Sequence, residues 1–189
     1  MEFYMLALAW AIYFFVHSFL ATHAVKNWAL NVFPKGFKYY RIAYNVIALS
    51  SILPLLSWSI SAENNQLFDN LYISILGGVV FVIGLMLLIG AFRAFDGMEF
   101  LGFKTEGEPK LVQAGMYAYV RHPLYFATIV VILGLFLLIP TQKMLLTLGI
   151  AYSYILIGYR LEERKLVAIF GAEYLAYQSR VKALIPYLL

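Results

Sequence analysis

Long apolar stretches separated by short polar segments dominate the pattern of positions along this chain. A helix needs roughly 20 mostly apolar residues to cross the hydrocarbon core of a bilayer. Five stretches approach or reach that length, and they run from Phe3 to Thr22, Tyr39 to Ile60, Leu71 to Phe92, Pro123 to Ile139 and Met144 to Tyr159. The pattern predicts an all-α membrane protein with about five transmembrane helices. Because no Lys or Arg precedes the first stretch, we expect a span there rather than a cleaved signal peptide.

The end of the chain has a different pattern. Only residues 140–143 separate the last two stretches, which predicts an antiparallel hairpin. From Leu161 to Val181, apolar residues then recur every three or four positions, with Glu and Arg between them. This spacing is typical of a C-terminal amphipathic helix at the membrane interface. We interpret residues 1–189 as one domain, with three spans and a loop in 1–108, and the hairpin and C-terminal helix in 109–189.

Composition supports the membrane class. Hydrophobic residues make up 63% of the chain and charged residues 13%, which is too apolar for a water-soluble domain. The absence of cysteine excludes disulfides, thiolate nucleophiles and thiolate metal sites. The formal net charge of +4 is modest, and we expect no nucleic-acid partner. No protein partner is inferred.

The basic residues predict an orientation. Thirteen of the fourteen Lys and Arg residues fall in the polar segments on one side, and Lys143 lies opposite. The segments on the basic side contain Lys26, Lys35, Lys38 and Arg41, then Arg93, Lys104, Lys110 and Arg121, and finally Arg160, Arg164, Lys165, Arg180 and Lys182. The positive-inside rule makes that side cytosolic, with the N-terminus outside. A bacterial inner membrane is the expected location.

The polar segment from Lys110 to Tyr125 is the strongest candidate for chemistry. It ends at Pro123, which suits the first turn of a helix because its ring fixes φ and its missing N–H would have no partner there. The amides of Leu124 and Tyr125 lie too early in that helix to bond within it. Such amides, together with the helix dipole, favour a carboxylate or phosphate. Arg121 and His122 precede this helix start.

Two carboxylates, Glu162 and Glu163, lie where the fifth span leaves the membrane, and the hairpin brings them beside this helix start. Glu162 could balance a cationic cofactor, and the rings of Tyr117 and Tyr125 could add cation–π attraction. S-adenosylmethionine has these features. In the alternative interpretation, Arg121 reaches lipid headgroups and the two glutamates are ordinary helix-start acids.

His17 lies within the first apolar stretch, where a polar group is costly enough to suggest that it lines a cavity. The alternative is a neutral histidine bonded to Ser18, Tyr13 or a backbone carbonyl. His23 lies at the membrane edge and can simply be solvated. A metal or haem site formed by His17 and His23 is weakly supported, because six residues separate them and one helical face needs three or four.

Several motifs in the second half resemble one known family. They are the run from Leu111 to Tyr125, the pair Glu162-Glu163, the run from Phe170 to Tyr177, and Ile185-Pro186. Their order and spacing resemble the isoprenylcysteine carboxyl methyltransferases and the related phospholipid methyltransferases. The first half looks more like a bacterial branch that includes thiol methyltransferases and NnrU-like proteins.

This resemblance implies an integral-membrane methyltransferase that binds S-adenosylmethionine. Its cofactor contacts would be Leu111, Val112, Tyr117, His122, Pro123, Leu124, Tyr125 and Glu162. Where carboxyl methyltransferases hold prenylcysteine with an arginine, this chain has Gly158. A lipophilic or small thiol, carboxylate or amine is therefore expected as acceptor, with the thiol and amine favoured over prenylcysteine. His122 or Arg160 would assist catalysis if a thiol must lose its proton, and no metal is expected.

Two other functions stay open at this point. One is a membrane reductase that uses NADPH and resembles the sterol reductases. The other is a non-catalytic membrane protein of the NnrU-like type. Binding of S-adenosylhomocysteine or NADPH would separate the first from a methyltransferase, and transfer of a labelled methyl group would separate the second.

Overall fold

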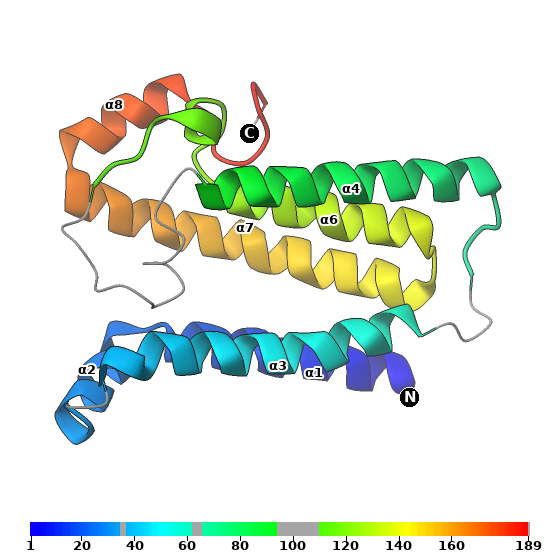
Figure 1. Cartoon of the computed structure of the whole chain (residues 1–189), viewed down its shortest axis with the longest axis horizontal. Helices are drawn as coiled ribbons and strands as arrows, with labels where there is room; N and C mark the ends of the chain where they lie inside the picture. The colour runs from blue at the N-terminus through cyan, green and yellow to red at the C-terminus, as the bar shows by residue number, and fades with distance from the viewer. Residues whose placement is uncertain (35–36, 62–65, 94–109, 189) are drawn as a thin grey trace. The chain divides into compact units, whose positions relative to one another are not determined.

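The structure is a computed structural model that describes residues 1–34, 37–61, 66–93 and 110–188 (Figure 1). In chain order the elements are α1 (Glu2–Leu20), α2 (His23–Val32), η1 (Phe37–Tyr39), α3 (Tyr40–Ile60), α4 (Leu71–Arg93), η2 (Gly115–Ala118), α6 (Pro123–Leu138), α7 (Gln142–Phe170) and α8 (Ala172–Arg180). All of these elements are helices, so the all-α prediction is confirmed. Lys35 and Lys104, two of the residues used to predict orientation, lie outside the described ranges.

The predicted spans agree with the helices. Within the described ranges, α1, α3, α4 and α7 are long and apolar enough to cross a membrane, and α6 is a shorter apolar helix of 16 residues. A straight helix of that length is about 24 Å long, against roughly 30 Å of hydrocarbon. Four candidate spans and this shorter apolar helix agree with the predicted architecture of about five transmembrane helices.

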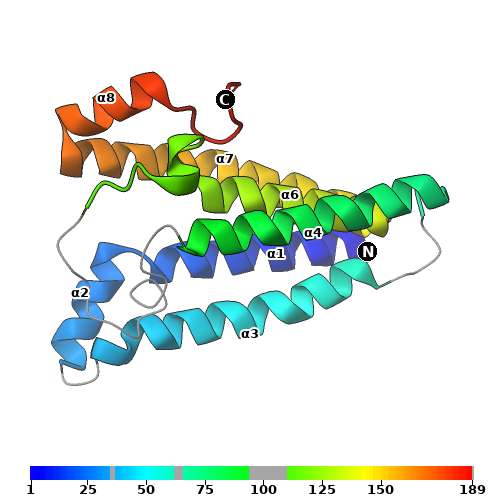
Figure 2. The same cartoon turned by 45° about the horizontal axis from the view of Figure 1, so that its top comes forward.

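The described helices form two compact units. The first contains α1, α2 and α3, with α1 and α3 lying side by side and antiparallel (Figure 2). Trp10 of α1 donates from Nε1 to the buried Oγ of Ser59 at 3.3 Å, and Tyr40 of α3 donates to the carbonyl of Leu20 at 2.6 Å. These two bonds join the two ends of α3 to the middle and the C-terminal end of α1.

The sequence analysis missed α2. This helix has only ten residues, too few for a span, and it is strongly amphipathic. The Thr22 hydroxyl caps it by accepting a hydrogen bond from the Val25 amide at 3.4 Å. Thr22 was assigned to the end of the first span, but its cap ends that span and starts a second helix.

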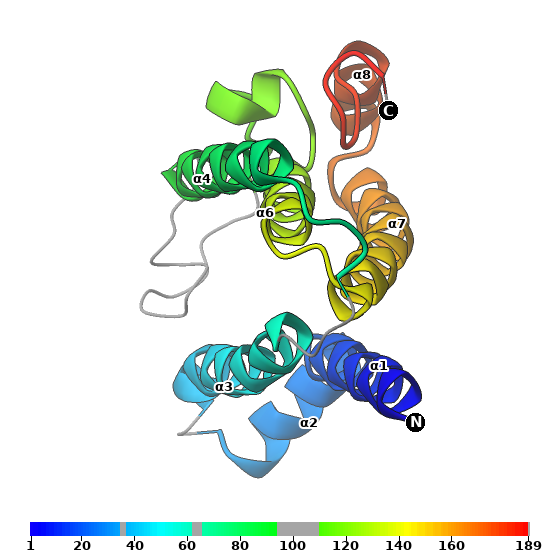
Figure 3. The same ribbon diagram turned by 90° about the vertical axis from the view of Figure 1, so that its right-hand side faces the viewer.

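The second unit contains α4, α6, α7 and α8, and Figure 3 shows α6 lying between α4 and α7. Helices α4 and α6 approach closely because glycine lies at their contact. A Cβ at Gly77 would come within 2.4 Å of the Leu138 backbone nitrogen, and one at Gly134 within 2.4 Å of that of Phe81. Glycine at these positions lets the two backbones touch, as is common between membrane helices.

The hairpin between α6 and α7 is confirmed, but the boundary after it was predicted wrongly. Thr141 caps α7 by accepting from the Met144 amide at 3.2 Å. Instead of ending at Tyr159, α7 continues to Phe170 and has 29 residues in all, and only α8 follows as a separate short helix. The break falls at Gly171, whose φ of 55° favours glycine. No proline or glycine interrupts the chain between Tyr159 and Phe170, so the charged residues there stay helical.

Whether residues 1–189 act as one domain stays a prediction, because the boundary drawn at residues 108 and 109 lies outside the described ranges.

Candidate functional site

The polar segment before α6 is fixed by the C-terminal end of the chain. Val120 and Lys182 form a parallel bridge, and the Arg121 amide donates to the Lys182 carbonyl at 2.8 Å. The His122 amide donates to the Ala183 carbonyl at 3.0 Å. Residues about sixty positions apart therefore hold His122 in place at the start of α6.

The side chain of Glu163, on α7, lies at the centre of the site. Arg121 binds it in a bidentate pair, with Nε to Oε1 and Nη2 to Oε2 both at 2.9 Å. Only 11% of the Arg121 side chain and 12% of the Glu163 side chain are exposed. This parallel geometry is the strongest form of arginine–carboxylate contact. The other terminal nitrogen of Arg121 donates to the carbonyls of Gln178 and Val181 at the end of α8.

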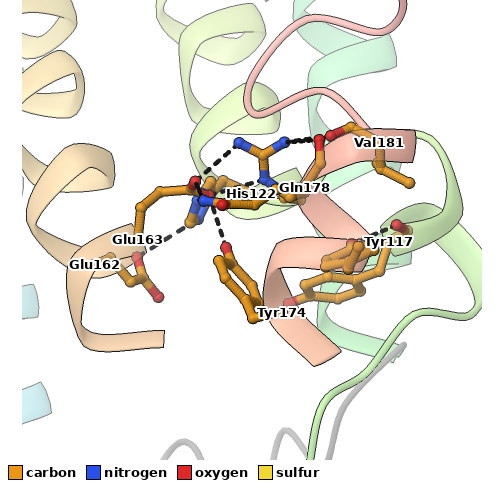
Figure 4. Close-up of polar contacts among 9 residues, drawn as sticks. Tyr117, His122, Glu162, Glu163, Tyr174, Gln178 and Val181 are labelled. Atoms are coloured by element: carbon orange, nitrogen blue, oxygen red, sulfur yellow. Dashed lines mark hydrogen bonds and ion pairs between the residues drawn. The ribbon is translucent and has the colours of Figure 1, made fainter. Parts of the chain in front are cut away.

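Three more side chains donate to the same carboxylate (Figure 4). His122 Nε2 lies 2.8 Å from Oε1, the Tyr174 hydroxyl donates to Oε1 at 2.7 Å, and Gln178 donates to Oε2. We call Arg121, His122, Glu163, Tyr174 and Gln178 the Glu163 cluster. Because an ionised carboxylate only accepts, His122 must carry a proton on Nε2. Its Nδ1 atom then faces away from Glu163.

Glu162 has a different environment. Neighbouring residues of a helix point about 100° apart, so Glu163 enters the cluster while Glu162 stays at its edge. Its side chain is 46% exposed, and Oε2 lies 3.6 Å from Nδ1 of the buried His122. Burial and the charge of Glu162 raise the pKa of Tyr117 to about 12, which shows that this carboxylate acts on the polar segment as well.

Two tyrosines of α8, Tyr174 and Tyr177, are neutral hydrogen-bond donors in the site, and the pKa of the Tyr117 phenol is raised as well. Tyr177 donates to the Tyr117 carbonyl at 2.5 Å, and burial raises its pKa to about 12. Burial and the hydrogen bond to Glu163 raise the pKa of Tyr174 as well. None of these three phenols can serve as a base near neutral pH. Among the described residues of the site, the carboxylates and His122 remain as candidate bases.

The other residues predicted for the site surround this arrangement. Leu111 and Val112 are partly buried just before η2, and Pro123 occupies the first position of α6, as expected. Leu124 and Tyr125 follow it in the first turn, and the Tyr125 ring lies 5.6 Å from that of His122 between centroids. The structure thus gathers the polar segment and Glu162, but their contacts with a cofactor stay predictions.

Arg160 lies apart from the Glu163 cluster. It donates to the Leu156 carbonyl of its own helix at 3.2 Å, and its guanidinium carbon lies 5.3 Å from the centre of the Tyr159 ring. The Tyr159 ring is 6.0 Å from that of His122. A catalytic role for Arg160 therefore stays a prediction that needs the side chain to turn away from Tyr159.

Gly158 of α7 lies next to the first turn of α6. A Cβ at this position would meet the Tyr125 hydroxyl at 3.7 Å, which is an ordinary contact. A side chain at position 158 would therefore point toward the start of α6. Because this residue is glycine, position 158 itself supplies no cation there.

The sequence analysis missed the roles of Glu163, Tyr174 and Gln178. Only Glu162 of the two glutamates was given a cofactor contact, Tyr174 was identified as part of the amphipathic helix and of the Phe170–Tyr177 motif, and Gln178 was given no role of its own. The sequence held one signal: Glu163, Tyr174 and Gln178 are spaced so that they share one face of a continuous helix. On a straight helix, Glu163 would still lie about three turns away from Tyr174. The bend at Gly171 makes them meet.

A family model described as phospholipid methyltransferase matches residues 71–173. This match covers more than half of the chain, from α4 to the start of α8. The chain belongs to the phospholipid methyltransferase family. Membership confirms the resemblance found in the sequence. The family is one of methyltransferases, as its description states.

The relatives of this family member carry related names. Methanethiol S-methyltransferase 1 of Bradyrhizobium diazoefficiens is 29% identical over 94% of this chain and 64% of its own length. Methanethiol S-methyltransferase of Crocosphaera subtropica is 29% identical over 91% of this chain and 70% of its own length. Protein-S-isoprenylcysteine O-methyltransferase of Saccharomyces cerevisiae is 29% identical over 45% of this chain and 36% of its own.

The chain thus spans less than two thirds of the Bradyrhizobium protein's length. No solved structure matches the chain significantly.

Proposed function

We propose that this family member is a membrane-embedded methyltransferase that uses S-adenosylmethionine and methylates a small or lipophilic thiol. Family membership supports the reaction type, and the names of the bacterial relatives support a thiol acceptor. Neither the family nor these relatives are named as reductases, so the NADPH-dependent alternative gains no support from them.

The observation that carries the proposal is the contrast between two adjacent carboxylates. Glu163 accepts hydrogen bonds from four side chains, so its charge is used within the protein. Glu162 is half exposed beside the buried His122, which leaves its charge available to a ligand. A rigid ionic cluster next to an accessible carboxylate is the arrangement expected of a site that binds a cation.

The residues at the site fit this cofactor. Glu162 matches its positive charge, the ring of Tyr117 or Tyr125 offers an aromatic face, and the first turn of α6 presents amides to a carboxylate. Leu111 and Val112 would pack against its apolar parts. When bound there, S-adenosylmethionine would supply a methyl group already activated for attack by sulfur.

The chain's own contribution would be mainly orientation and exclusion of water. A thiol acceptor must lose its proton as its sulfur forms the new bond to carbon. His122 Nδ1 and Glu162 Oε2, 3.6 Å apart, form a pair that could take up that proton at the cluster edge. The Glu163 cluster would hold the imidazole in the required orientation.

The membrane setting completes the proposal. The several apolar helices make the protein an integral membrane protein in contact with the bilayer. We place the cofactor site on the cytosolic side of a bacterial inner membrane, because the basic residues gather there. A lipophilic acceptor would then enter from the bilayer.

Calorimetric titration of the detergent-purified protein tests the cofactor. S-adenosylhomocysteine should bind, and NADPH should not. Glu162→Gln should weaken binding by at least about thirtyfold, since removing one partner of a poorly solvated charge pair costs about 2–5 kcal/mol. Asp69→Asn is the matched control, because Asp69 is an exposed acid in the loop before α4. Equal affinity in the wild type and Glu162→Gln would rule out the role given to Glu162.

Methyl transfer is tested separately. Labelled S-adenosylmethionine and methanethiol should give a labelled thioether with the purified wild-type protein. Binding of S-adenosylhomocysteine without any transfer, to methanethiol or to a membrane extract, would indicate a non-catalytic family member.

A further inference from the structure

A cavity of about 320 Å³ lies between α1 and α3 in the first unit, and none of the site residues described above lines it. Its volume is at the lower end of the range for small-molecule sites, roughly 300–1,000 Å³. Its walls include Ala9, Tyr13 and His17 from α1, and Tyr44, Ala48 and Ser51 from α3. The Trp10–Ser59 and Tyr40–Leu20 bonds join the two helices on either side of it.

The cavity has one polar wall. The Tyr44 hydroxyl lies 3.0 Å from Nδ1 and 2.9 Å from Nε2 of His17. Tyr13 stacks on the same imidazole, with ring centroids 5.8 Å apart and planes 22° apart. These two tyrosines fix the ring, so the polar wall has a defined position between apolar side chains.

This polar wall has hydrogen-bonding capacity for a ligand. A hydroxyl has one hydrogen, so Tyr44 can donate to only one of the two nitrogens of His17, and an imidazole offers both a donor and an acceptor when neutral. A ligand hydroxyl can donate or accept a hydrogen bond, so it can pair with whichever His17 nitrogen does not bond to Tyr44. The lining residues include no Asp, Glu, Lys or Arg, so a charged ligand would find no countercharge.

We propose that this cavity binds a small neutral molecule with an apolar body and a single hydroxyl group, which bonds to the His17–Tyr44 pair. A histidine within an apolar membrane helix is costly and is usually retained for a site rather than for packing. Polar contacts also join membrane helices, but the Trp10–Ser59 and Tyr40–Leu20 bonds already serve α1 and α3 in that way. The proposal does not depend on methyl transfer.

Photolabelling tests the proposal with a defined probe. The purified protein in phospholipid nanodiscs is treated with an octanol that carries a diazirine, and the labelled residues are mapped by mass spectrometry. Labelling of α1 and α3 residues around the cavity should saturate. It should be displaced by 1-octanol and much less by n-octane, because only the alcohol can bond to the polar wall.

Two kinds of variant distinguish the contribution of the polar wall to ligand binding from the contribution of the cavity volume. Tyr44→Phe and His17→Phe keep the ring volume and should weaken labelling roughly fivefold, as expected for the loss of one hydrogen bond. Ala48→Leu should abolish labelling because it fills the cavity while leaving the polar pair in place. Tyr72→Phe, on the exposed surface of α4, is the control and should label as the wild type does.

The proposal is wrong if labelling does not saturate, if n-octane competes as well as 1-octanol, or if Ala48→Leu is labelled like the wild type. The Ala48→Leu result also decides the case if the phenylalanine variants do not fold. S-adenosylhomocysteine binding, measured on the same variants, reports separately on the site in the second unit.

Discussion

At the scale of single residues, two adjacent glutamates with the same chemistry have different environments. The Glu163 side chain is 12% exposed and surrounded by donors, whereas that of Glu162 is 46% exposed. The helix geometry that points them apart thus places Glu163 within the cluster and leaves Glu162 accessible at its edge, where we propose that it binds the cofactor.

This contrast predicts opposite effects of one substitution. Glu163→Gln leaves the buried Arg121 without its charge partner and should destabilise the protein by about 3–5 kcal/mol. Glu162→Gln should change the free energy of unfolding by less than about 0.5 kcal/mol, because the Glu162 side chain is half exposed. The same variant should bind the cofactor more weakly. Thermal unfolding in detergent, with and without S-adenosylhomocysteine, measures both. Equal melting temperatures for Glu163→Gln and the wild type would contradict the assignment of Glu163 to the structure.

The glycine at position 158 leads to a prediction about the methyl acceptor. A carboxylate acceptor needs a fixed cation, and a bidentate arginine has the best shape for it. The position facing the Tyr125 hydroxyl has no side chain, and Arg160 lies over Tyr159 instead. We therefore expect a farnesylcysteine analogue to be a poor methyl acceptor compared with methanethiol, as measured with labelled S-adenosylmethionine. Saturable methylation of that analogue, abolished by Arg160→Ala, would show that Arg160 holds the carboxylate after all.

At the scale of elements, one glycine of the second unit lies at a close helix contact and another does not. Gly134 lies where α6 touches α4, and a Cβ there would come within 2.4 Å of the Phe81 backbone nitrogen. Gly149 lies in α7 with no atom within 4 Å of the corresponding Cβ position. The same residue is thus required by packing in one helix and not in the other.

The two glycines form a matched pair for a stability measurement. Gly134→Ala should destabilise the protein by about 1–3 kcal/mol, since backbones must move apart to admit the methyl group. Gly149→Ala should be neutral or stabilising by up to about 1 kcal/mol, since alanine favours the helix. Thermal unfolding of the two variants in the same detergent compares them. A loss of stability in Gly149→Ala as large as that in Gly134→Ala would show that general helix effects, not close packing, set the result.

At the scale of the whole molecule, the length of α7 links the membrane to the site. Its 29 residues extend about 44 Å, more than the roughly 30 Å of hydrocarbon, so its charged end emerges from the bilayer. Glu162 and Glu163 lie on that end. This length is consistent with the proposed function, in which a polar cofactor and a lipophilic acceptor meet at the membrane surface.

The orientation of the chain gives a further prediction. Because the sequence contains no cysteine, single cysteines can be placed without a background. A cysteine at Arg164 should resist an impermeant thiol reagent in intact cells and react after lysis, as the positive-inside rule requires. A cysteine at Asp69, in the loop before α4, should react in intact cells. The reverse pattern would invert the topology and move the proposed cofactor site away from the cytosol.

The sequence by itself determined the five long apolar helices and where they start, because the length of an apolar stretch and the fixed φ of Pro123 are local properties, but it revealed neither α2 nor the continuation of α7 to Phe170. The predicted start at Leu71 agrees with α4, and the predicted starts of the other spans lie within two residues of the helices. The resemblance also placed His122 and Glu162 in one site, and the structure brings them to 3.6 Å.

Only the tertiary structure decided which side chains became partners. Glu163 meets Arg121 across 42 positions, and His17 meets Tyr44 across 27, where the sequence had suggested Ser18, Tyr13 or a carbonyl. Apolar helix faces resemble one another, so periodicity does not reveal which two will pack or at what register. The turn at Gly171 and the contact of α1 with α3 settle these pairings, because they bring distant polar groups together where water is scarce and each must find a partner.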